Sequence, residues 1–154
     1  MIQGKLLSYN DDLSEVLEIL REVFIEELGY KQEQVFDGKD MEAVHVIIYE
    51  VSESKKAVAA GRLTYDGTEY CLSNIAVLKE FRNNGLGDLA VRMLLNKAFL
   101  SGARQVSVET IESNKKFYSN IGFCDDGGLF IKRGLRCFRM VITKNDLKKK
   151  CMNN

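Results

Sequence analysis

Several things that this sequence lacks narrow the kinds of protein it can encode. Its 22 basic and 22 acidic side chains cancel, so net charge favours neither nucleic acid nor an anionic membrane surface as a partner. It has one histidine and four cysteines, and Cys71, Cys124, Cys137 and Cys151 show no paired metal-ligand spacing. The sequence therefore predicts no metal site and four reduced thiols.

Long apolar runs are missing as well. Residues 1–5 lack the apolar core of a signal peptide, and no run approaches the roughly 20 residues of a membrane span. We therefore expect a cytoplasmic protein with no membrane partner.

The length and hydrophobic content fit one domain. With 154 residues, of which 45% are hydrophobic, the chain is long enough to bury a sizeable core. We expect a single domain over residues 1–145 and a basic C-terminal tail over residues 146–154, in which Lys148, Lys149 and Lys150 cluster.

Hydrophobic periodicity predicts a mixed α/β domain. Apolar residues three and four positions apart predict helices over residues 13–28, 86–102 and 113–121. Apolar runs bounded by polar residues predict strands over residues 2–8, 44–51, 57–65, 69–77, 105–110, 129–131 and 135–142. Because a helix separates the strand over 69–77 from the strand over 105–110, these two should be parallel, whereas hairpins make their neighbours antiparallel.

Local signals predict how some of these elements begin and end. Asp12 and Glu15 have the spacing of a capping box at the start of the first helix, and Gly29 is placed to end it. The pair Asp66-Gly67 predicts a two-residue turn ahead of the strand over 69–77. The polar residues 30–42 should form a loop or an irregular short helix.

The clearest functional signal is the turn Arg82-Asn83-Asn84-Gly85-Leu86-Gly87, which joins a strand to an amphipathic helix. Gly85 and Gly87 carry no Cβ, so an anion can approach the free backbone N–H groups at the helix start. No Gly-Lys-Ser/Thr is present, which excludes a nucleotide-triphosphate P-loop, and a third glycine at the dinucleotide-binding spacing is missing. The turn therefore predicts a phosphate site of another kind.

The same turn matches the Arg/Gln-x-x-Gly-x-Gly/Ala signature of the GNAT N-acetyltransferases. The strand Asn74-Ile75-Ala76-Val77 precedes it at the family spacing. Downstream, Phe117-Tyr118-Ser119-Asn120-Ile121-Gly122-Phe123 matches the family's Phe-Tyr-x-x-x-Gly-Phe segment. Because three motifs in order are more specific than one, the chain resembles a small, bacterial-type, single-domain member of this family.

This resemblance implies an α/β fold in which a central, twisted and mostly antiparallel sheet contains one splayed parallel strand pair and is flanked by helices. It implies acetyl-CoA as the cofactor, with coenzyme A as the product. Ile111 stands where many relatives have asparagine, so either Asn114 or water is expected to supply that contact instead. The implied cofactor-binding residues are Ile75, Ala76, Val77, Arg82, Asn83, Asn84, Gly85, Leu86, Gly87, Asn114 and Phe117.

The resemblance also suggests catalytic residues. Tyr118 stands where the family places the general acid, a phenol that protonates the departing thiolate. Glu27 and His45 are the candidates for a base, because they belong to segments that resemble a subgroup of small bacterial GNAT proteins. Leu28 departs from that subgroup, which has glutamine there. The matching residues are Val23, Phe24, Glu27, Asp37, Asp40 and His45.

These features predict an N-acetyltransferase that moves the acetyl group of acetyl-CoA to a primary amine of an unidentified small molecule or peptide, by direct attack in a ternary complex. Two alternatives stay open. The first is a non-catalytic module that binds coenzyme A or acyl-CoA. The second is a structural α/β domain with a coincidental glycine turn. A homodimer is a family-level expectation. The first helix and residues 30–42 should shape the acceptor pocket.

Overall fold

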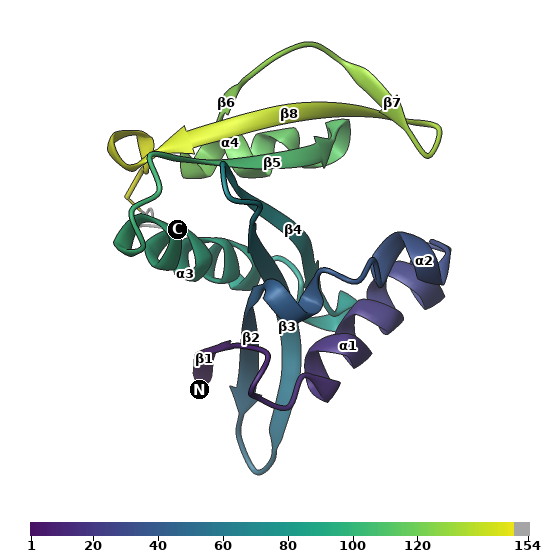
Figure 1. Cartoon of the computed structure of the whole chain (residues 1–154). Coiled ribbons are helices and arrows are strands. Elements are labelled where there is room, and N and C mark those ends of the chain that lie inside the picture. The colour runs from purple at the N-terminus through teal and green to yellow at the C-terminus, as the bar shows by residue number, and fades with distance from the viewer. Residues whose placement is uncertain (150–154) are drawn as a thin grey trace.

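The computed structural model describes residues 1–149, which form one mixed sheet with helices on both faces (Figure 1). The strands are β1 (Ile2–Leu7), β2 (Val44–Val51), β3 (Lys55–Tyr65), β4 (Tyr70–Val77), β5 (Gln105–Ile111), β6 (Cys124–Asp125), β7 (Phe130–Lys132) and β8 (Leu135–Thr143). The α-helices are α1 (Ser14–Leu20), α2 (Gln32–Val35), α3 (Leu86–Leu100) and α4 (Lys115–Ile121). A π-helix, η1 (Arg21–Glu27), continues α1, and the 3-10 turns are η2 (Asp40–Glu42), η3 (Lys79–Phe81), η4 (Glu112–Asn114) and η5 (Lys144–Asp146).

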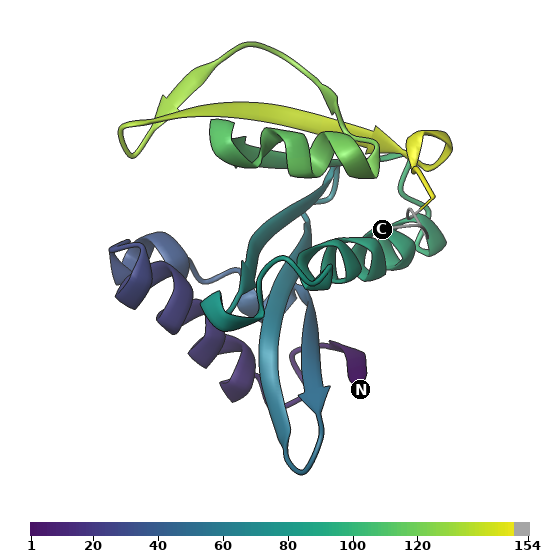
Figure 2. The same ribbon diagram turned by 180° about the vertical axis from the view of Figure 1, so that it is seen from behind.

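The sheet has the strand order β1-β2-β3-β4-β5-β8-β6, with β7 also paired to β8. Its pairs are antiparallel except β4 with β5, as the sequence predicted. This parallel pair is short: its register runs from Tyr70 opposite Val106 to Leu72 opposite Val108 and then stops. Figures 1 and 2 show β4 leaving β5 beyond that point. The predicted fold, with one splayed parallel pair, is confirmed.

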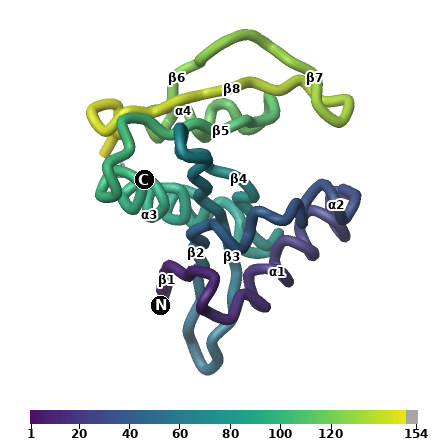
Figure 3. The backbone as a smooth tube through the Cα atoms, viewed as in Figure 1, coloured from purple at the N-terminus to yellow at the C-terminus, as the bar shows by residue number. Residues whose placement is uncertain are grey.

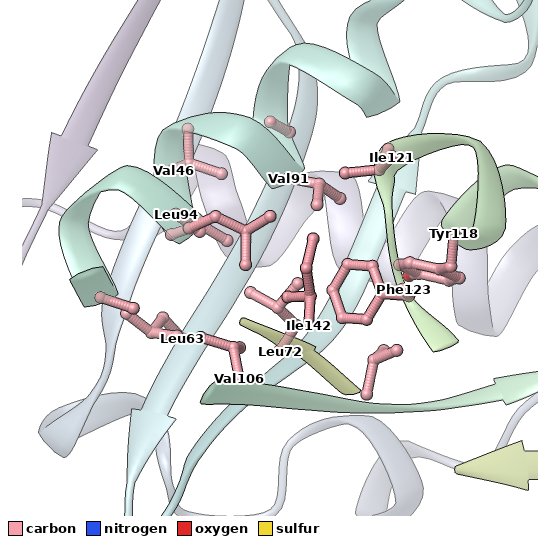
Figure 4. Packing of buried hydrophobic residues seen from close by; sticks show 14 of the residues in the cluster. Val46, Leu63, Leu72, Val91, Leu94, Val106, Tyr118, Ile121, Phe123 and Ile142 are labelled. Atoms are coloured by element: carbon pink, nitrogen blue, oxygen red, sulfur yellow. The ribbon is translucent and has the colours of Figure 1, made fainter. Parts of the chain in front are cut away.

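Two apolar clusters hold the sheet between its helices. On one face α3 and α4 pack against the strands, and on the other face α1 covers residues of β2, β3 and β4. Each large buried side chain contributes about 1.5–3 kcal/mol relative to its exposed state. Figure 4 shows part of the first cluster, with side chains from α3, α4 and the sheet in contact: Val91, Leu94, Val106, Tyr118, Ile121, Phe123 and Ile142.

The first helix covers the predicted residues to within one at each end, as α1 followed by η1, but its start is capped differently. The predicted capping box is wrong: Asp12 accepts a hydrogen bond from the Ser14 N–H at 2.9 Å, whereas Glu15 accepts one from the Tyr49 hydroxyl at 2.8 Å. A tertiary partner on β2 therefore takes the side chain that the local pattern assigned to the cap. Towards its end the helix widens to π geometry, and Gly29, at φ 74°, follows it as predicted.

Two more local predictions differ from the structure. The Asp66-Gly67 signal lies in a four-residue connection, because Tyr65 pairs with Tyr70 and the Asp66 carboxylate accepts the N–H groups of Thr68 and Glu69. That side chain stabilises the longer turn. The two-residue strand β6 was not predicted.

The last described residues pack on the domain. The Lys148 N–H donates to the Ile121 carbonyl at 2.8 Å, and Leu147 lies against the apolar cluster under α3. The rest of the predicted basic tail, residues 150–154, lies outside the described residues. Within residues 1–149, none of the helices has the length and apolar character that crossing a membrane requires.

Gly122 fixes the end of α4, and its replacement tests that role. Its φ is 130°, and a Cβ there would overlap the Asp146 carbonyl oxygen. Gly127, at φ 112°, has open space around it. Both Gly→Ala variants should carry about 1–3 kcal/mol of backbone strain, and Gly122→Ala should lose about 2 kcal/mol more through the overlap. Urea unfolding of the two variants and the parent measures this; equal losses would contradict the packing of α4 on η5.

Candidate active site

The site is built around a bulge in β4. Ala76 pairs with Ala60 and Ser73 pairs with Arg62, so Gly61 alone faces both intervening residues of β4, Asn74 and Ile75. Asn74 adopts a left-handed φ of 54°. A Cβ on Gly61 would lie only 2.7 Å from the Ile75 side chain, so glycine leaves room for the extra residue. Because a bulge bends its strand and increases its twist, it accounts for the departure of β4 from β5.

Beyond the bulge, β4 directs the peptide groups of one residue, Val77, towards its open side. The Leu78 N–H donates to the Val58 carbonyl at 2.9 Å, and Ala76 pairs with Ala60, so these residues face β3. By the alternation of an antiparallel ladder, the Val77 N–H and C=O point away from β3. Of the three strand residues predicted to bind cofactor, Val77 thus has its backbone groups directed at the gap, where its C=O already accepts a hydrogen bond from Arg82 and its N–H is left for a ligand. The backbone groups of Ala76 are used by β3.

The glycine turn places more free N–H groups beside that strand edge. Gly85 caps α3 at φ 77°, and Leu89 is the first residue to donate back, to the Gly85 carbonyl at 3.0 Å. The N–H groups of Leu86, Gly87 and Asp88 come before it and have no acceptor within the helix. They lie at the positive end of the helix dipole, where an anion is stabilised.

Asn83 and Asn84 shape this turn. Asn83 takes a left-handed φ of 67°, and the Asn84 side-chain amide donates to the carbonyls of Phe81 and Arg82, both at 3.3 Å. Both residues are exposed. They belong to the predicted phosphate turn, and the structure gives them the conformation that turns its backbone.

The strand, the turn and α4 meet at one glycine. A Cβ built on Gly87 would lie 3.4 Å from the Phe117 ring and 3.6 Å from a methyl group of Val77. Three residues that the sequence assigned to the cofactor, from three separate elements, are therefore neighbours. Asn114, also assigned to it, is exposed at the start of α4.

Tyr118 lies on α4 beside Phe117 and is 6% exposed. Its ring packs edge-on against Phe117 and Phe123, with centroids 4.9 and 5.3 Å away. Burial raises the pKa of the Tyr118 phenol above its usual value. The hydroxyl therefore stays protonated at neutral pH, as a proton donor must.

Arg82 and Glu27 form an ion pair that the sequence did not predict. The guanidinium donates to both Glu27 carboxylate oxygens, at 2.6 and 2.7 Å, and its Nε donates to the Val77 carbonyl at 2.9 Å. The hydrogen bond from Arg82 lowers the pKa of the Glu27 carboxyl. A carboxylate with a lowered pKa is a weaker base, and this pair joins η1 to the cofactor turn.

His45 lies away from the surface, on β2. It is fully buried, and its Nε2 is 3.0 Å from the Asp40 carbonyl oxygen. Because that oxygen only accepts, Nε2 carries the proton of the neutral ring, and Nδ1 has no partner among the described residues. The two residues predicted as candidate bases thus have separate partners, Glu27 with Arg82 and His45 with Asp40.

Sequence reasoning missed Arg62, a charged residue within the apolar strand β3. It is 4% exposed and donates to Asp37, Asp40 and Ser73. The sequence does contain a signal for it: a charged residue in a run that predicts a central strand is rarely buried without a partner, so Arg62 calls for carboxylates nearby. Its hydrogen bonds lower the pKa of the Asp37 carboxyl to about 2.

A cavity of about 700 Å³ lies between α1, α2 and the segment that leads to β2. Phe36, Gly38, Asp40 and Met41 form one wall, and residues of α1 and α2 form the others. Figure 3 shows α2 and β7 on the same side of the molecule. There the Arg133 guanidinium of the β7–β8 turn lies 4.6 Å from the Tyr30 ring centre. Residues 30–42 and the first helix thus line a recess; that it takes the acceptor stays a prediction.

The described residues offer no metal site: within 1–149, no group of three or more His, Cys, Asp or Glu side chains is placed to hold an ion. Cys71, Cys124 and Cys137 are free thiols, and Cys151 lies outside the described residues.

A strand edge that diverges from its parallel neighbour, next to a helix start with free amides, defines the class of acyl-CoA N-acyltransferases. The comparisons with known proteins agree. A family model described as an acetyltransferase (GNAT) domain matches residues 16–144. This chain belongs to the GNAT acetyltransferase family, and it is an acetyl-CoA-dependent acyltransferase. The family predicted from the sequence is confirmed.

Individual relatives are distant in sequence but close in fold. The protein YyaT of Bacillus subtilis (strain 168) is 28% identical over 134 residues, which are 85% of this chain and 88% of YyaT. The structure of ElaA from Escherichia coli has a TM-score of 0.82 at 17% identity and covers 92% of this chain and 99% of its own. A GNAT family acetyltransferase from Elizabethkingia anophelis, solved with acetyl-CoA bound, has a TM-score of 0.69 at 13% identity. The match covers 92% of this chain and 97% of that structure's chain.

The lowered pKa of Asp37 predicts how pH affects stability. A carboxyl whose folded pKa is about 2, against 3.8 unfolded, stabilises the fold above pH 4 and loses that contribution as pH falls towards 2. The free energy of unfolding of Asp37→Asn should therefore fall furthest below the parent's at pH 7, and the gap should narrow below pH 4. Asp125→Asn, which breaks a surface pair with Lys115, is the control and should show a small gap. If the difference in unfolding free energy between the parent and Asp37→Asn stays constant from pH 7 to 2.5, the ion pair is contradicted.

Proposed function

We propose that this protein transfers the acetyl group of acetyl-CoA to a primary amine of a small molecule or peptide, by direct attack in a ternary complex. The observation that carries this proposal is the meeting of Val77, Gly87 and Phe117 beside the free amides of α3. A cofactor that is extended at one end and anionic at the other fits a strand edge that leads to a helix start.

The cofactor is held mainly by backbone. The Val77 N–H on the open side of β4, next to the bulge at Ile75, would hold the pantetheine arm. The N–H groups of Leu86, Gly87 and Asp88, in the turn that Asn83 and Asn84 shape, would hold the pyrophosphate. Arg82 already bonds Glu27 and Val77, so it acts by fixing the turn. Asn114 and Phe117 flank the cofactor from α4.

The chemistry needs few side chains. The amine nitrogen attacks the thioester carbonyl, the new C–N bond forms and the C–S bond breaks. Tyr118 hydrogen-bonds the developing thiolate and donates its proton to the sulfur; the amine loses its proton to solvent, and the Tyr118 phenolate takes one back from solvent, so the protons balance over the turnover. Holding both reactants in line supplies most of the acceleration, and general acid catalysis contributes about 10²–10⁴-fold.

We assign the base role to water. Both oxygens of Glu27 bond Arg82, and His45 is buried beneath Asp40. An alkylamine with a pKa near 10.4 is neutral in roughly one molecule in 2,500 at pH 7, and that fraction enters the cavity and attacks. Glu27 acts through Arg82 as a positioning residue. The cavity of about 700 Å³ is the acceptor recess, since its wall residue Asp40 bonds Arg62, which in turn bonds Ser73 beside the bulge.

The alternative function, a module that binds coenzyme A without catalysis, shares every cofactor contact. Release of free thiol with any amine of a panel separates the two; we would use spermidine, kanamycin, phenylethylamine and a tetrapeptide with a free amino terminus. The cytoplasmic location and the homodimer stay predictions.

Binding of acetyl-CoA is tested first, by calorimetric titration of the parent protein and Gly87→Leu. Leucine suits the helical backbone there, but its side chain would occupy the space between Phe117 and Val77. We expect saturable binding to the parent and at least a 100-fold loss in the variant. Gly128→Leu is the matched control, because that glycine has open space and no positive φ. If acetyl-CoA does not bind to the parent protein, the proposed function is wrong.

Replacement of Tyr118 by phenylalanine tests the acid. The variant keeps the ring packing and loses the proton, so kcat should fall about 10²–10⁴-fold while the Kd for acetyl-CoA stays within about twofold. Tyr65→Phe, whose hydroxyl bonds only the Gly67 carbonyl at the far end of β3, should leave both constants unchanged. An undiminished kcat in Tyr118→Phe at saturating amine removes the assignment.

The same assay between pH 6 and 9 tests the base. With water as the proton acceptor and an alkylamine of pKa near 10.4 as the substrate, the rate at low amine rises about tenfold per pH unit in both the parent and Glu27→Gln. A plateau in the parent that disappears in Glu27→Gln would make Glu27 the base after all.

A further inference from the structure

Arg62 is a buried cation on β3 that bonds several acceptors. Burying a guanidinium is costly unless its N–H groups find acceptors. Here Nε donates to the Ser73 hydroxyl at 2.9 Å, Nη1 to Asp37 at 2.8 Å and to Asp40 at 3.1 Å, and Nη2 to the second oxygen of Asp37 at 2.9 Å. Four of its five N–H groups are therefore bonded.

These bonds lead to two different parts of the molecule. Ser73 is the last residue of β4 before the bulge at Asn74 and Ile75. Asp37 and Asp40 belong to the segment between α2 and β2, which has little regular structure of its own. One side chain thus connects the cofactor strand to a connecting segment.

A second bond fixes the same segment. The Asp40 carbonyl accepts the Nε2–H of His45, and His45 is the cross-strand partner of Arg62. The segment is therefore attached by side chain to β3 and by backbone to β2, at adjacent positions on one face of the sheet. Because α2 is a single four-residue turn, it cannot hold the segment alone.

The attached segment is one wall of the acceptor recess. Phe36, Gly38, Asp40 and Met41 line the cavity, whereas Arg62 itself lies behind them. Moving this wall changes the shape of the recess and its distance from the bulge. It leaves the amides of Leu86, Gly87 and Asp88 in place.

We infer that Arg62 is a positioning residue for the acceptor: it holds residues 36–41, one wall of the recess, at a fixed position relative to the bulge of β4. This inference rests on the proposed function. It assigns Arg62 no contact with substrate or cofactor; its effect passes through Asp37 and Asp40 on one side and Ser73 on the other.

The test is Arg62→Lys, which keeps the charge but loses the fork that bonds several acceptors at once. With the fastest amine of the panel above, we expect KM for the amine to rise at least tenfold, while kcat and the Kd for acetyl-CoA stay within about threefold. Asp37→Asn should raise the same KM by a smaller factor. The matched control is Arg139→Lys, since Arg139 also bonds two carboxylates, Glu69 and Asp126, but on β8. It should leave all three constants within about twofold.

Either of two results overturns the inference: an unchanged KM in Arg62→Lys, or a parallel loss of amine and acetyl-CoA binding. If Arg62→Lys fails to fold, Ser73→Ala takes its place, because it removes only the bond to β4; an unchanged KM there counts equally against the inference.

A parent protein that transfers acetyl to none of the amines would refute the proposed function separately. Hydrogen exchange then tests Arg62 without activity. Arg62→Lys should speed amide exchange at least tenfold in residues 36–43 and leave residues 83–88 unchanged. Unaltered exchange in residues 36–43 would overturn the inference.

Discussion

The divergence of β4 from β5 is the constraint on which the rest of this structure depends. A parallel pair that stays together has no unpaired edge, but here pairing stops at Leu72 and the bulge opposite Gly61 turns the strand away. The strand is held on both faces while it does so, with Leu72 in one apolar cluster and Ala76 in the other. The exposed edge and the start of α3 then lie side by side, which gives one site for an extended chain and its phosphates.

Two arginines connect the N-terminal part of the chain to this strand. Arg62 bonds Ser73 before the bulge, and Arg82 bonds the Val77 carbonyl after it. Each also holds carboxylates from the N-terminal part of the chain, Asp37 and Asp40 in one case and Glu27 in the other. Charge-assisted hydrogen bonds of this kind are stronger and more directional than neutral ones. The segments around the proposed acceptor recess are therefore fixed to β4 on both sides of its bulge, next to the proposed cofactor site.

The sequence was sufficient for features that depend on local pattern. Periodicity predicted the strands and helices, the helix between two strands predicted their parallel pairing, and the spacing of three motifs predicted the family. It failed where a distant residue decided the outcome. Glu15 bonds Tyr49 and not its own helix start, and Glu27 bonds Arg82, 55 residues away. The engagement of Arg82 by Glu27 and Val77 is likewise invisible in a motif that names only the arginine.

The central claim is that the open edge of β4 and the start of α3 hold acetyl-CoA together. Backbone amide NMR during titration with acetyl-CoA tests it most directly, because each N–H reports its own environment. The account predicts the largest shifts at Val77, Leu86, Gly87 and Asp88, with smaller ones along α4 around Tyr118. Saturable shifts that leave Val77 and Gly87 unmoved would contradict it.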